Sequence, residues 1–494
     1  MKIAGKIALL FMILFAVILF SASCSGEPDA DTGGAPAGNN AADTPGGETP
    51  DGEKPTVEEI KDSLPDGIDY GGYEFTVYLR NREDYFSDFY IEGEIGEVLN
   101  DAVYQRNKKT EERFNVNFKF ELYPFDDWSN TSLTRLIQAG DDAFDIAAVH
   151  GTSIFGLGYN DFLFDWRENM PYVELDAVWW PDDINKNISA FGKLYGATGD
   201  ITYTYLDFAG CLFFNKELFM NLGMDYPYES VLDGTWTLDK FISIVKAGMD
   251  DLNGDGAITP DADRFGMDIR NFWHFPNEIF YSAGDRSVSL TSDGVPELAM
   301  YSPRTVDIYD KFFDMMSSKA AYINDLNDPE NAFADGRALF YNAGLWNIVE
   351  YRALDFDIGI IPLPKYDANT PKYYTPVNQN TSMIIVPVTA PDTERTSVIV
   401  EALAAEGYRS LIPAFYEISL KTKHARDDES AAMLDIIRDG AICDYGMFDV
   451  TIMGDLLNFG AAMAQNNTSF TTIYERNRDA VERNIGRLKE KYGF

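Results

Sequence analysis

Cysteine, histidine and basic residues are scarce in this sequence, and each shortage excludes a class of protein. Three Cys and three His among 494 residues exclude a disulfide scaffold and a metal centre built from several Cys or His ligands. The 40 Lys and Arg are outnumbered by 80 Asp and Glu, which gives a formal net charge of −40. A field of that sign repels phosphate backbones and anionic lipid head groups. Nucleic-acid binding is therefore excluded, and any contact with a membrane needs another cause.

Residues 1–23 have the features of an export signal peptide. Two lysines precede an apolar run over residues 7–20, and these 14 residues are fewer than the ~20 that span a bilayer. Small residues then lead to Cys24, where a bacterial lipoprotein carries its lipid. An ordinary cleaved signal with an incidental Cys is the alternative. Residues 24–69 are acidic and rich in Gly, Pro and Ala, which predicts a flexible tether. We expect a palmitate-bearing lipoprotein anchored to the outer face of the cytoplasmic membrane.

The next part of the chain predicts an α/β fold. Patterns of strand type over 73–79, 116–122 and 144–149 alternate with helical spacing over 97–114 and 132–139. This order is typical of a parallel sheet covered by helices, in which ligands bind outside the carboxyl ends of the strands. His150 follows the third strand at that place and is a candidate ligand-binding residue.

Further elements are predicted up to the C-terminus, without any internal repeat. Thr237 is the expected N-cap of a helix. The other predicted elements are strands over 337–343, 356–362 and 383–387, and helices over 392–406 and 470–492.

Five short segments carry motifs that occur together in one known family. They are LFFNKELF (212–219), GTWTLD (234–239), GRALFYNAGLW (336–346), IIPLP (360–364) and QNTSMIIVP (379–387). In this order they resemble the extracellular solute-binding proteins (family 1) of ABC importers, whose characterised members mostly bind sugars. Leu238 departs from the family pattern by replacing an Asp, and Leu345 by replacing a Pro.

The resemblance implies a type II, two-lobe periplasmic-binding-protein-like fold, with the ligand in the cleft between the lobes. Lobe one would comprise about 70–205 and 382–425, and lobe two about 208–378 and 428–494.

A sugar presents apolar C–H faces and many hydroxyls, so its site needs aromatic platforms with polar side chains at the edges. The resemblance implies that Trp346 stacks on a sugar ring, with a core tryptophan as the alternative, and that Trp236 only packs its helix. Tyr203, Tyr205 and Asp207 alternate, which predicts one face of an extended strand where the chain first crosses between lobes. Further candidates for the cleft are Trp273, His274, Trp180 and Tyr445. A surface imidazole is the alternative for His274.

Residues 251–256 (DLNGDG) match the start of a calcium-binding loop. Asp251, Asn253 and Asp255 supply oxygens at its first, third and fifth positions. Ala262 stands where the last ligand, a Glu, is expected, and a loop one residue longer would use Asp263 instead. A structural calcium ion and a simple Asp/Asn/Gly turn are the two interpretations. No cofactor is required.

The sequence contains no G-x-S-x-G, H-E-x-x-H or P-loop motif, so catalysis finds little support. We interpret the protein as the non-enzymatic, monomeric substrate-binding component of an ABC importer. It would capture a sugar or oligosaccharide and deliver it to a membrane permease. The alternatives are a binding protein for another solute, such as a peptide, and a secreted glycoside hydrolase, which needs only two suitably spaced carboxyl groups. Cys211 and Cys443 are expected to be buried thiols, with a bridge between them as the alternative.

Overall fold

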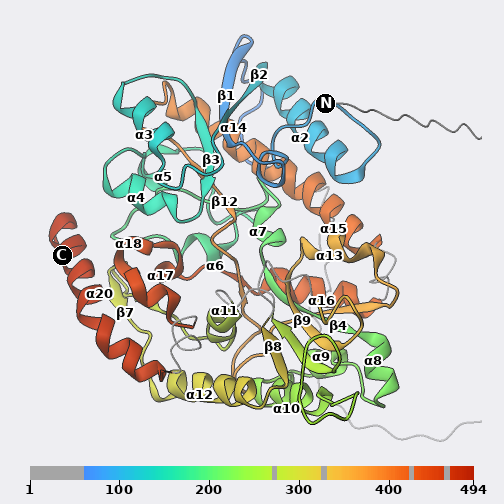
Figure 1. Ribbon diagram of the computed structural model, residues 1–494. Coiled ribbons are helices and arrows are strands. Elements are labelled where there is room, and N and C mark those ends of the chain that lie inside the picture. Colours follow the sequence, from blue (N-terminus) through green and yellow to red (C-terminus); the bar gives the residue numbers. More distant parts are fainter. Residues whose placement is uncertain (1–59, 270–274, 324–330, 422–427, 461–467) are drawn as a thin grey trace, which may run out of the picture. The chain divides into compact units, whose positions relative to one another are not determined.

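The computed structural model describes residues 60–269, 275–323, 331–421, 428–460 and 468–494. In these residues two β-sheets, each covered by helices, form the cores of two lobes (Figure 1). The predicted signal peptide, Cys24 and most of the predicted tether lie outside the described residues. No helix in the described ranges has the length and apolar character that crossing a membrane requires.

Lobe one contains a four-stranded sheet in the order β12-β3-β1-β2. Its strands are β1 (Tyr73–Arg80), β2 (Val116–Tyr123), β3 (Ile146–His150) and β12 (Ser382–Ile385). β1 lies parallel to β2 and β3, because helices connect these strands as crossovers, while β12 runs antiparallel to β3. β12 thus brings a distant part of the sequence into the first sheet.

Helices flank this sheet, and three of them pack on one another at its side: α2, α14 and α15 (Figure 1). A π-helical turn, η3 (Gly407–Leu411), joins α14 to α15. The helices are α1 (Glu83–Phe86), α2 (Val98–Phe114), α3 (Thr131–Gln138), α4 (Ser153–Tyr159), α5 (Trp166–Asn169), α6 (Asp182–Asn185), α7 (Thr204–Asp207), α14 (Thr393–Glu406) and α15 (Ile412–Lys421).

Lobe two contains a five-stranded sheet in the order β10-β4-β9-β5-β8. Its strands are β4 (Gly210–Asn215), β5 (Phe265–Ile269), β8 (Ala321–Ile323), β9 (Ala338–Gly344) and β10 (Ile358–Pro362). β4 is antiparallel to both of its neighbours, whereas β5 is parallel to both of its own. All residues of β4, β5 and β10 are buried, as expected for strands covered on both faces.

The remaining helices include a long C-terminal helix, α20, which packs along α18 and α12 (Figure 1). The helices are α8 (Lys216–Asn221), α9 (Tyr228–Leu232), α10 (Leu238–Gly248), α11 (Phe275–Ser282), α12 (Pro303–Ser317), α13 (Asn347–Glu350), η2 (Tyr351–Ala353), α16 (Asp428–Asp439), α17 (Tyr445–Phe448), α18 (Val450–Met453), η4 (Gly454–Asn458) and α20 (Phe470–Tyr492). The structure also contains two small strand pairs: β6 (Val288–Leu290) with β7 (Pro296–Leu298), and β11 (Thr375–Pro376) with β13 (Ala441–Ile442).

Two chain segments that cross between the lobes lie side by side. Ala209, just before β4, forms an isolated antiparallel bridge with Val377. The Asn378 N–H donates to the Phe208 carbonyl over 2.9 Å. The crossing region is therefore a short two-stranded connection beside the space between the sheets.

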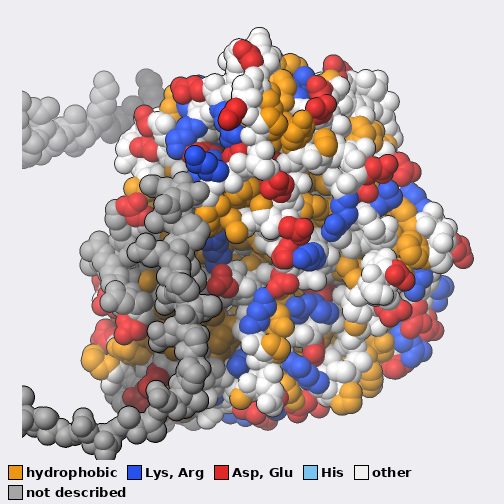
Figure 2. Space-filling view, turned by 180° about the vertical axis from the view of Figure 1, so that it is seen from behind, with side chains coloured by type: hydrophobic (Ala, Val, Ile, Leu, Met, Phe, Trp, Pro, Cys, Tyr) orange, Lys and Arg blue, Asp and Glu red, His pale blue; other side chains and the backbone are white. Residues whose placement is uncertain are grey.

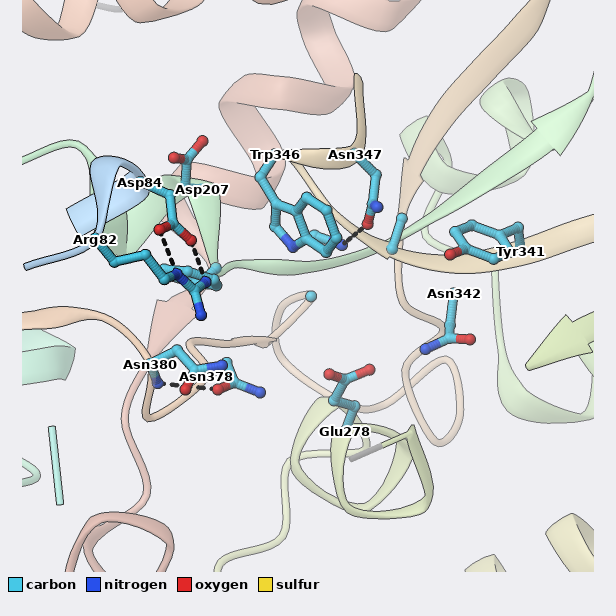
Figure 3. A pocket seen from close by; sticks show the side chains of 14 residues that line it. Arg82, Asp84, Asp207, Glu278, Tyr341, Asn342, Trp346, Asn347, Asn378 and Asn380 are labelled. Carbon is cyan, nitrogen blue, oxygen red and sulfur yellow. Dashed lines mark hydrogen bonds and ion pairs between the residues drawn. The ribbon is translucent and has the colours of Figure 1, made fainter. Parts of the chain in front are cut away.

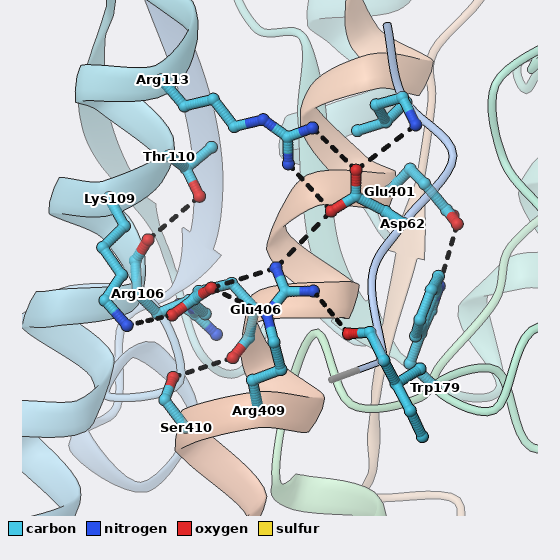
Figure 4. Close-up of polar contacts among 12 residues, drawn as sticks. Asp62, Arg106, Lys109, Thr110, Arg113, Trp179, Glu401, Glu406, Arg409 and Ser410 are labelled. Atoms are coloured by element: carbon cyan, nitrogen blue, oxygen red, sulfur yellow. Dashed lines mark hydrogen bonds and ion pairs between the residues drawn. The ribbon is translucent and has the colours of Figure 1, made fainter. Parts of the chain in front are cut away.

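Residues 60–69, which we expected to belong to the tether, are packed against lobe one. The Leu64 side chain is buried. Asp62 accepts two hydrogen bonds from the Arg113 guanidinium, at 2.7 and 2.8 Å, and a longer contact from Arg409 (Figure 4). These residues therefore fold with the lobe, because an apolar side chain and a paired carboxylate fix them there.

The predicted elements are found close to their expected bounds. The three strands and two helices predicted at the start of lobe one correspond to β1, β2, β3, α2 and α3. The Thr237 hydroxyl caps α10 by accepting from the Lys240 N–H. Trp236 is fully buried, and its indole N–H donates to the Pro362 carbonyl over 3.0 Å, so its predicted packing role is confirmed. Cys211 and Cys443 are free buried thiols.

Acidic and basic side chains are interspersed over the face shown in Figure 2, rather than gathered in separate patches. On this face the excess of acidic residues is therefore not concentrated into one docking surface of a single sign.

Candidate functional site

A pocket of about 240 Å³ lies between the two lobes, beside the crossing segments. Lobe one contributes Arg82 and Asp84, which follow β1, and the two crossings contribute Asp207 and Asn380 (Figure 3). Lobe two contributes α11 and the end of β9 with the residues that follow it. The pocket thus takes side chains from both lobes, so a solute bound in it touches both.

Trp346 lines this pocket, and 43% of its surface is exposed. Its stacking on a sugar ring, which the resemblance implied, stays a prediction. Its ring lies against the backbone at Gly344. A Cβ on Gly344 would come within 2.7 Å of both the Trp346 ring and the Asp207 carbonyl oxygen. The backbone N–H of Trp346 also donates to that carbonyl over 3.3 Å. Glycine at 344 therefore allows the indole to lie close to the first crossing.

Four asparagine side chains supply hydrogen-bonding groups to the pocket: Asn342, Asn347, Asn378 and Asn380. The Asn378 side-chain oxygen accepts from the Asn380 N–H over 2.9 Å. The Asn347 oxygen accepts from the Gly344 N–H over 3.2 Å. These bonds orient the amides before a ligand arrives, which lowers the entropic cost of binding.

Three carboxyl groups line the same pocket, in different electrostatic surroundings (Figure 3). Asp84 forms an ion pair with the Arg82 guanidinium. Asp207 lies at the end of α7, where burial, together with the nearby Asp88 and Asp84 carboxylates, raises its pKa well above the usual value. Glu278 lies on α11, where burial raises its pKa to about 8. The pocket therefore favours protonation of two of its acids.

His150 is buried at the end of β3, and it positions a pocket residue. Its Nε2 lies 3.0 Å from Oδ1 of Asn380, and its Nδ1 lies 2.7 Å from the Thr152 hydroxyl. The Trp128 ring packs edge-on against the imidazole, with the centroids 5.2 Å apart. The structure thus places His150 behind the pocket wall, in contact with Asn380.

Tyr205, Trp180 and Tyr445 are each buried away from this pocket. The Tyr205 hydroxyl donates to Asp200 over 2.6 Å, and the Trp180 indole donates to Glu401 over 2.8 Å. The Tyr445 hydroxyl lies 2.6 Å from that of Tyr159. Each polar group has a partner inside the protein, which explains why these side chains are stable in the interior.

The predicted extended strand through Tyr203, Tyr205 and Asp207 is wrong. Residues 204–207 form the helical turn α7, so side chains two positions apart diverge instead of sharing a face. Asp207 lines the pocket, whereas Tyr203 is buried with its hydroxyl 2.9 Å from that of Ser87. Trp273 and His274 lie outside the described residues.

The predicted calcium loop is closed by its own hydrogen bonds. The Asp251 carboxylate accepts from the N–H groups of Gly254 and Gly256, at 2.7 and 2.8 Å. Asp263 accepts from the Leu252 N–H over 2.9 Å. The Asn253 amide donates to Asp255 over 3.1 Å. Within the described residues, no group of three or more His, Cys, Asp or Glu is arranged to hold a metal ion. Calcium binding stays a prediction, which chelation with EDTA tests.

Sequence reasoning missed Glu278, Arg82, Asp84 and the asparagines of the pocket. A signal was present for two of them, because Arg82 and Asp84 directly follow the carboxyl end of β1, where the same rule had selected His150 after β3. Glu278 lies inside a mostly apolar helix and carries no comparable signal.

One known protein family matches most of this chain. The family model of the bacterial extracellular solute-binding proteins matches residues 92–407, which is more than half of the sequence. The chain belongs to this family. No curated protein sequence matches it. The resemblance inferred from the five motifs is thereby confirmed, and so is the interpretation of the chain as a solute-binding protein.

Solved structures of distant sequence share the fold. The sugar-binding protein MalE from Xanthomonas citri has a TM-score of 0.61 at 12% identity, over 85% of this chain and 99% of that one. The GacH receptor of Streptomyces glaucescens, solved unliganded and with acarbose, has a TM-score of 0.52 at 15% identity, over 85% and 98%. UgpB from Mycobacterium tuberculosis, in complex with glycerophosphocholine, has a TM-score of 0.53 at 14% identity, over 85% and 99%. The predicted α/β, two-lobe binding-protein fold is confirmed.

Proposed function

We propose that this solute-binding protein captures a sugar or oligosaccharide between its lobes and delivers it to the permease of an ABC importer. The observation that carries the proposal is the composition of the pocket. An exposed tryptophan, Trp346, shares it with four side-chain amides and three carboxyl groups. An indole face covers the C–H face of a pyranose, and the amides and acids bind its hydroxyls. The sugar ligands of the structural relatives MalE and GacH support the same class.

The lobes proposed for this role are about 70–205 with 382–425, and about 208–378 with 428–494. Ligand binding between them stabilises the closed form, because only that form brings Arg82 and Asn380 onto the same ligand as Trp346. Closure then gives the permease a way to distinguish loaded from empty protein.

A thermal-shift screen of the full chain against neutral mono- and oligosaccharides tests the proposal. A ligand at about 100 times its Kd adds roughly 2.7 kcal/mol to the free energy of unfolding, which raises the melting temperature measurably. A set of di- to tetrapeptides is the matched comparison. Shifts with peptides alone would replace the sugar by a peptide.

We further propose that the protein binds its ligand without turnover. A glycoside hydrolase needs two carboxyl groups on either side of the scissile bond, and Asp207 and Glu278 do line one pocket. Incubating the full chain with each stabilising oligosaccharide, and following reducing ends over time, separates the two activities. Steady release of reducing ends would make the protein an enzyme.

We propose that Cys24 carries acyl chains, palmitate among them, and holds a monomeric protein to the outer face of the cytoplasmic membrane. The anchor is needed because a net charge of −40 opposes binding to an anionic membrane surface. Cys24→Ser is expected to move the protein from the detergent-soluble membrane fraction into the medium or periplasm. Unchanged retention in the membrane fraction would contradict the lipid anchor.

A further inference from the structure

Glu278 is a buried carboxyl group that faces the pocket. Only 9% of the residue is exposed, and its buried Oε2 has no hydrogen-bond partner among the residues that the structure describes. Its carboxyl carbon lies 3.5 Å from where a Cβ of Gly210 would be, at the start of β4. In Figure 3 the carboxyl group points from α11 into the cavity. A polar atom left unpaired in this position costs stability, unless a ligand supplies the missing donor.

The pocket is lined by fewer basic than acidic side chains. Among the described residues that line it, Arg82 is the one basic residue, and its guanidinium is paired with Asp84. Asp207 and Glu278 remain without a basic partner in these residues, and the nearby Asp88 and Asp84 carboxylates add negative charge around Asp207. The pocket therefore carries an excess of two acids over bases.

We propose that the preferred ligand carries a cationic amine, as in an amino sugar, which binds the Glu278 carboxylate while Trp346 covers the apolar face of the ring. This inference rests on the proposed function, and it names the chemical class within it. An ammonium group supplies up to three donors, and it compensates the charge of carboxylates that otherwise have no counter-ion. The indole face adds a cation–π attraction. The protein's net charge of −40 draws cations toward the pocket and repels anionic solutes.

A neutral sugar is the competing ligand, and it would require a different protonation state of Glu278. Glu278 would then stay protonated and exchange hydrogen bonds with hydroxyl groups. A glutamine makes nearly the same bonds as a protonated glutamic acid, but it cannot become an anion. Glu278→Gln therefore separates recognition of a charge from recognition of a hydroxyl.

The experiment titrates the full chain, at about pH 6, where amines are protonated. The probes are glucosamine oligomers and the same oligomers fully N-acetylated, with cello-oligosaccharides as the hydroxyl series. Calorimetry in buffers of different ionisation enthalpy also counts protons. We expect glucosamine oligomers to bind at least about tenfold more tightly than the neutral series, a difference of ~1.4 kcal/mol. They should also release a proton as Glu278 ionises. The other titratable or charged groups to include in this count are Asp207, Asp84 and Arg82, which line the same pocket, and Cys211, which interacts electrostatically with Glu278.

Glu278→Gln should remove most of this preference and reduce the proton release. Glu217→Gln, which makes the same change on the exposed surface of α8, is the control and should behave as wild type. If neutral oligosaccharides bind as tightly as glucosamine oligomers, the inference is overturned and the proposed function stands. If neither series binds, both are overturned.

Discussion

Two regions of the molecule combine tryptophan with a buried glutamate, and they differ in what the glutamate contacts. In lobe one, Glu401 accepts hydrogen bonds from the indole N–H groups of Trp179 and Trp180, at 2.9 and 2.8 Å. Glu278 and Trp346 both line the pocket, and the Oε2 of Glu278 has no hydrogen-bond partner within the described part of the chain. Figure 4 shows Glu401 beside Trp179, and Figure 3 shows Glu278 among the residues that line the pocket.

Burial alone is therefore not enough to identify a functional acid. Burial raises the pKa of both groups, to about 7 for Glu401 and about 8 for Glu278. Both lie far above the usual value for glutamate, yet one has its hydrogen bonds satisfied by the protein and the other does not. The unsatisfied oxygen, and not the pKa, distinguishes a group available to a ligand from one used to hold the fold.

The largest expected difference is between the two kinds of tryptophan. Trp180→Ala should lower the free energy of unfolding by ~3–5 kcal/mol, because it leaves a cavity in a closed core. Trp346→Ala should leave stability nearly unchanged and weaken sugar binding by roughly ten- to a hundredfold, on the ~1–3 kcal/mol scale of aromatic stacking. Urea denaturation and calorimetric titration of both variants check this. A Trp346 variant that unfolds far earlier, yet binds normally when folded, would show that Trp346 supports the fold.

A smaller effect is expected when Glu401 is changed to glutamine. The amide keeps the volume but offers one oxygen to two indole donors, and its NH₂ group faces one of them. Leaving one buried donor unpaired should cost ~1–3 kcal/mol of unfolding free energy. Urea denaturation measures it. Stability equal to that of wild type would mean that the two indole bonds contribute little, and the contrast with Glu278 would then fail.

The effect of Glu278→Gln depends on pH, and it is smallest at acidic pH. The folded-state pKa of Glu278, about 8, lies above the ordinary value of 4.5, so the folded protein retains a proton that the unfolded chain loses. Stability of wild type therefore falls as pH rises from 4.5 to about 8, relative to the variant, by up to ~1.4 kcal/mol per pH unit.

Melting temperatures of the ligand-free full chain, measured across this range, give the difference curve. Contributions from Glu401 and other buried acids cancel, since both proteins contain them. The variant should be the more stable protein near pH 8 and should lose this advantage near pH 4.5. Parallel curves for variant and wild type would show that Glu278 titrates normally.

Much of the fold was predictable from the sequence, because strands and helices leave a local pattern. The strand predicted over 73–79 lies within β1, and the helical spacing of 470–492 corresponds to α20. Local pattern failed at residues 203–207, where a period of two in the sequence coincides with one turn of helix, α7.

The sequence alone predicted the α/β character, the order of the elements and the family motifs, and it selected Trp346 as a candidate for the ligand site. Which other side chains line the pocket with Trp346 depends on the tertiary structure. Trp180 is buried because Glu401, 221 positions away, accepts its N–H, and Asn380 is held by His150, 230 positions away. Glu278 and Glu401 are the same residue type, each on a helix, and no local pattern separates them. Local sequence could not separate them, because the exposure and hydrogen bonding of a side chain depend on which distant segments fold against it.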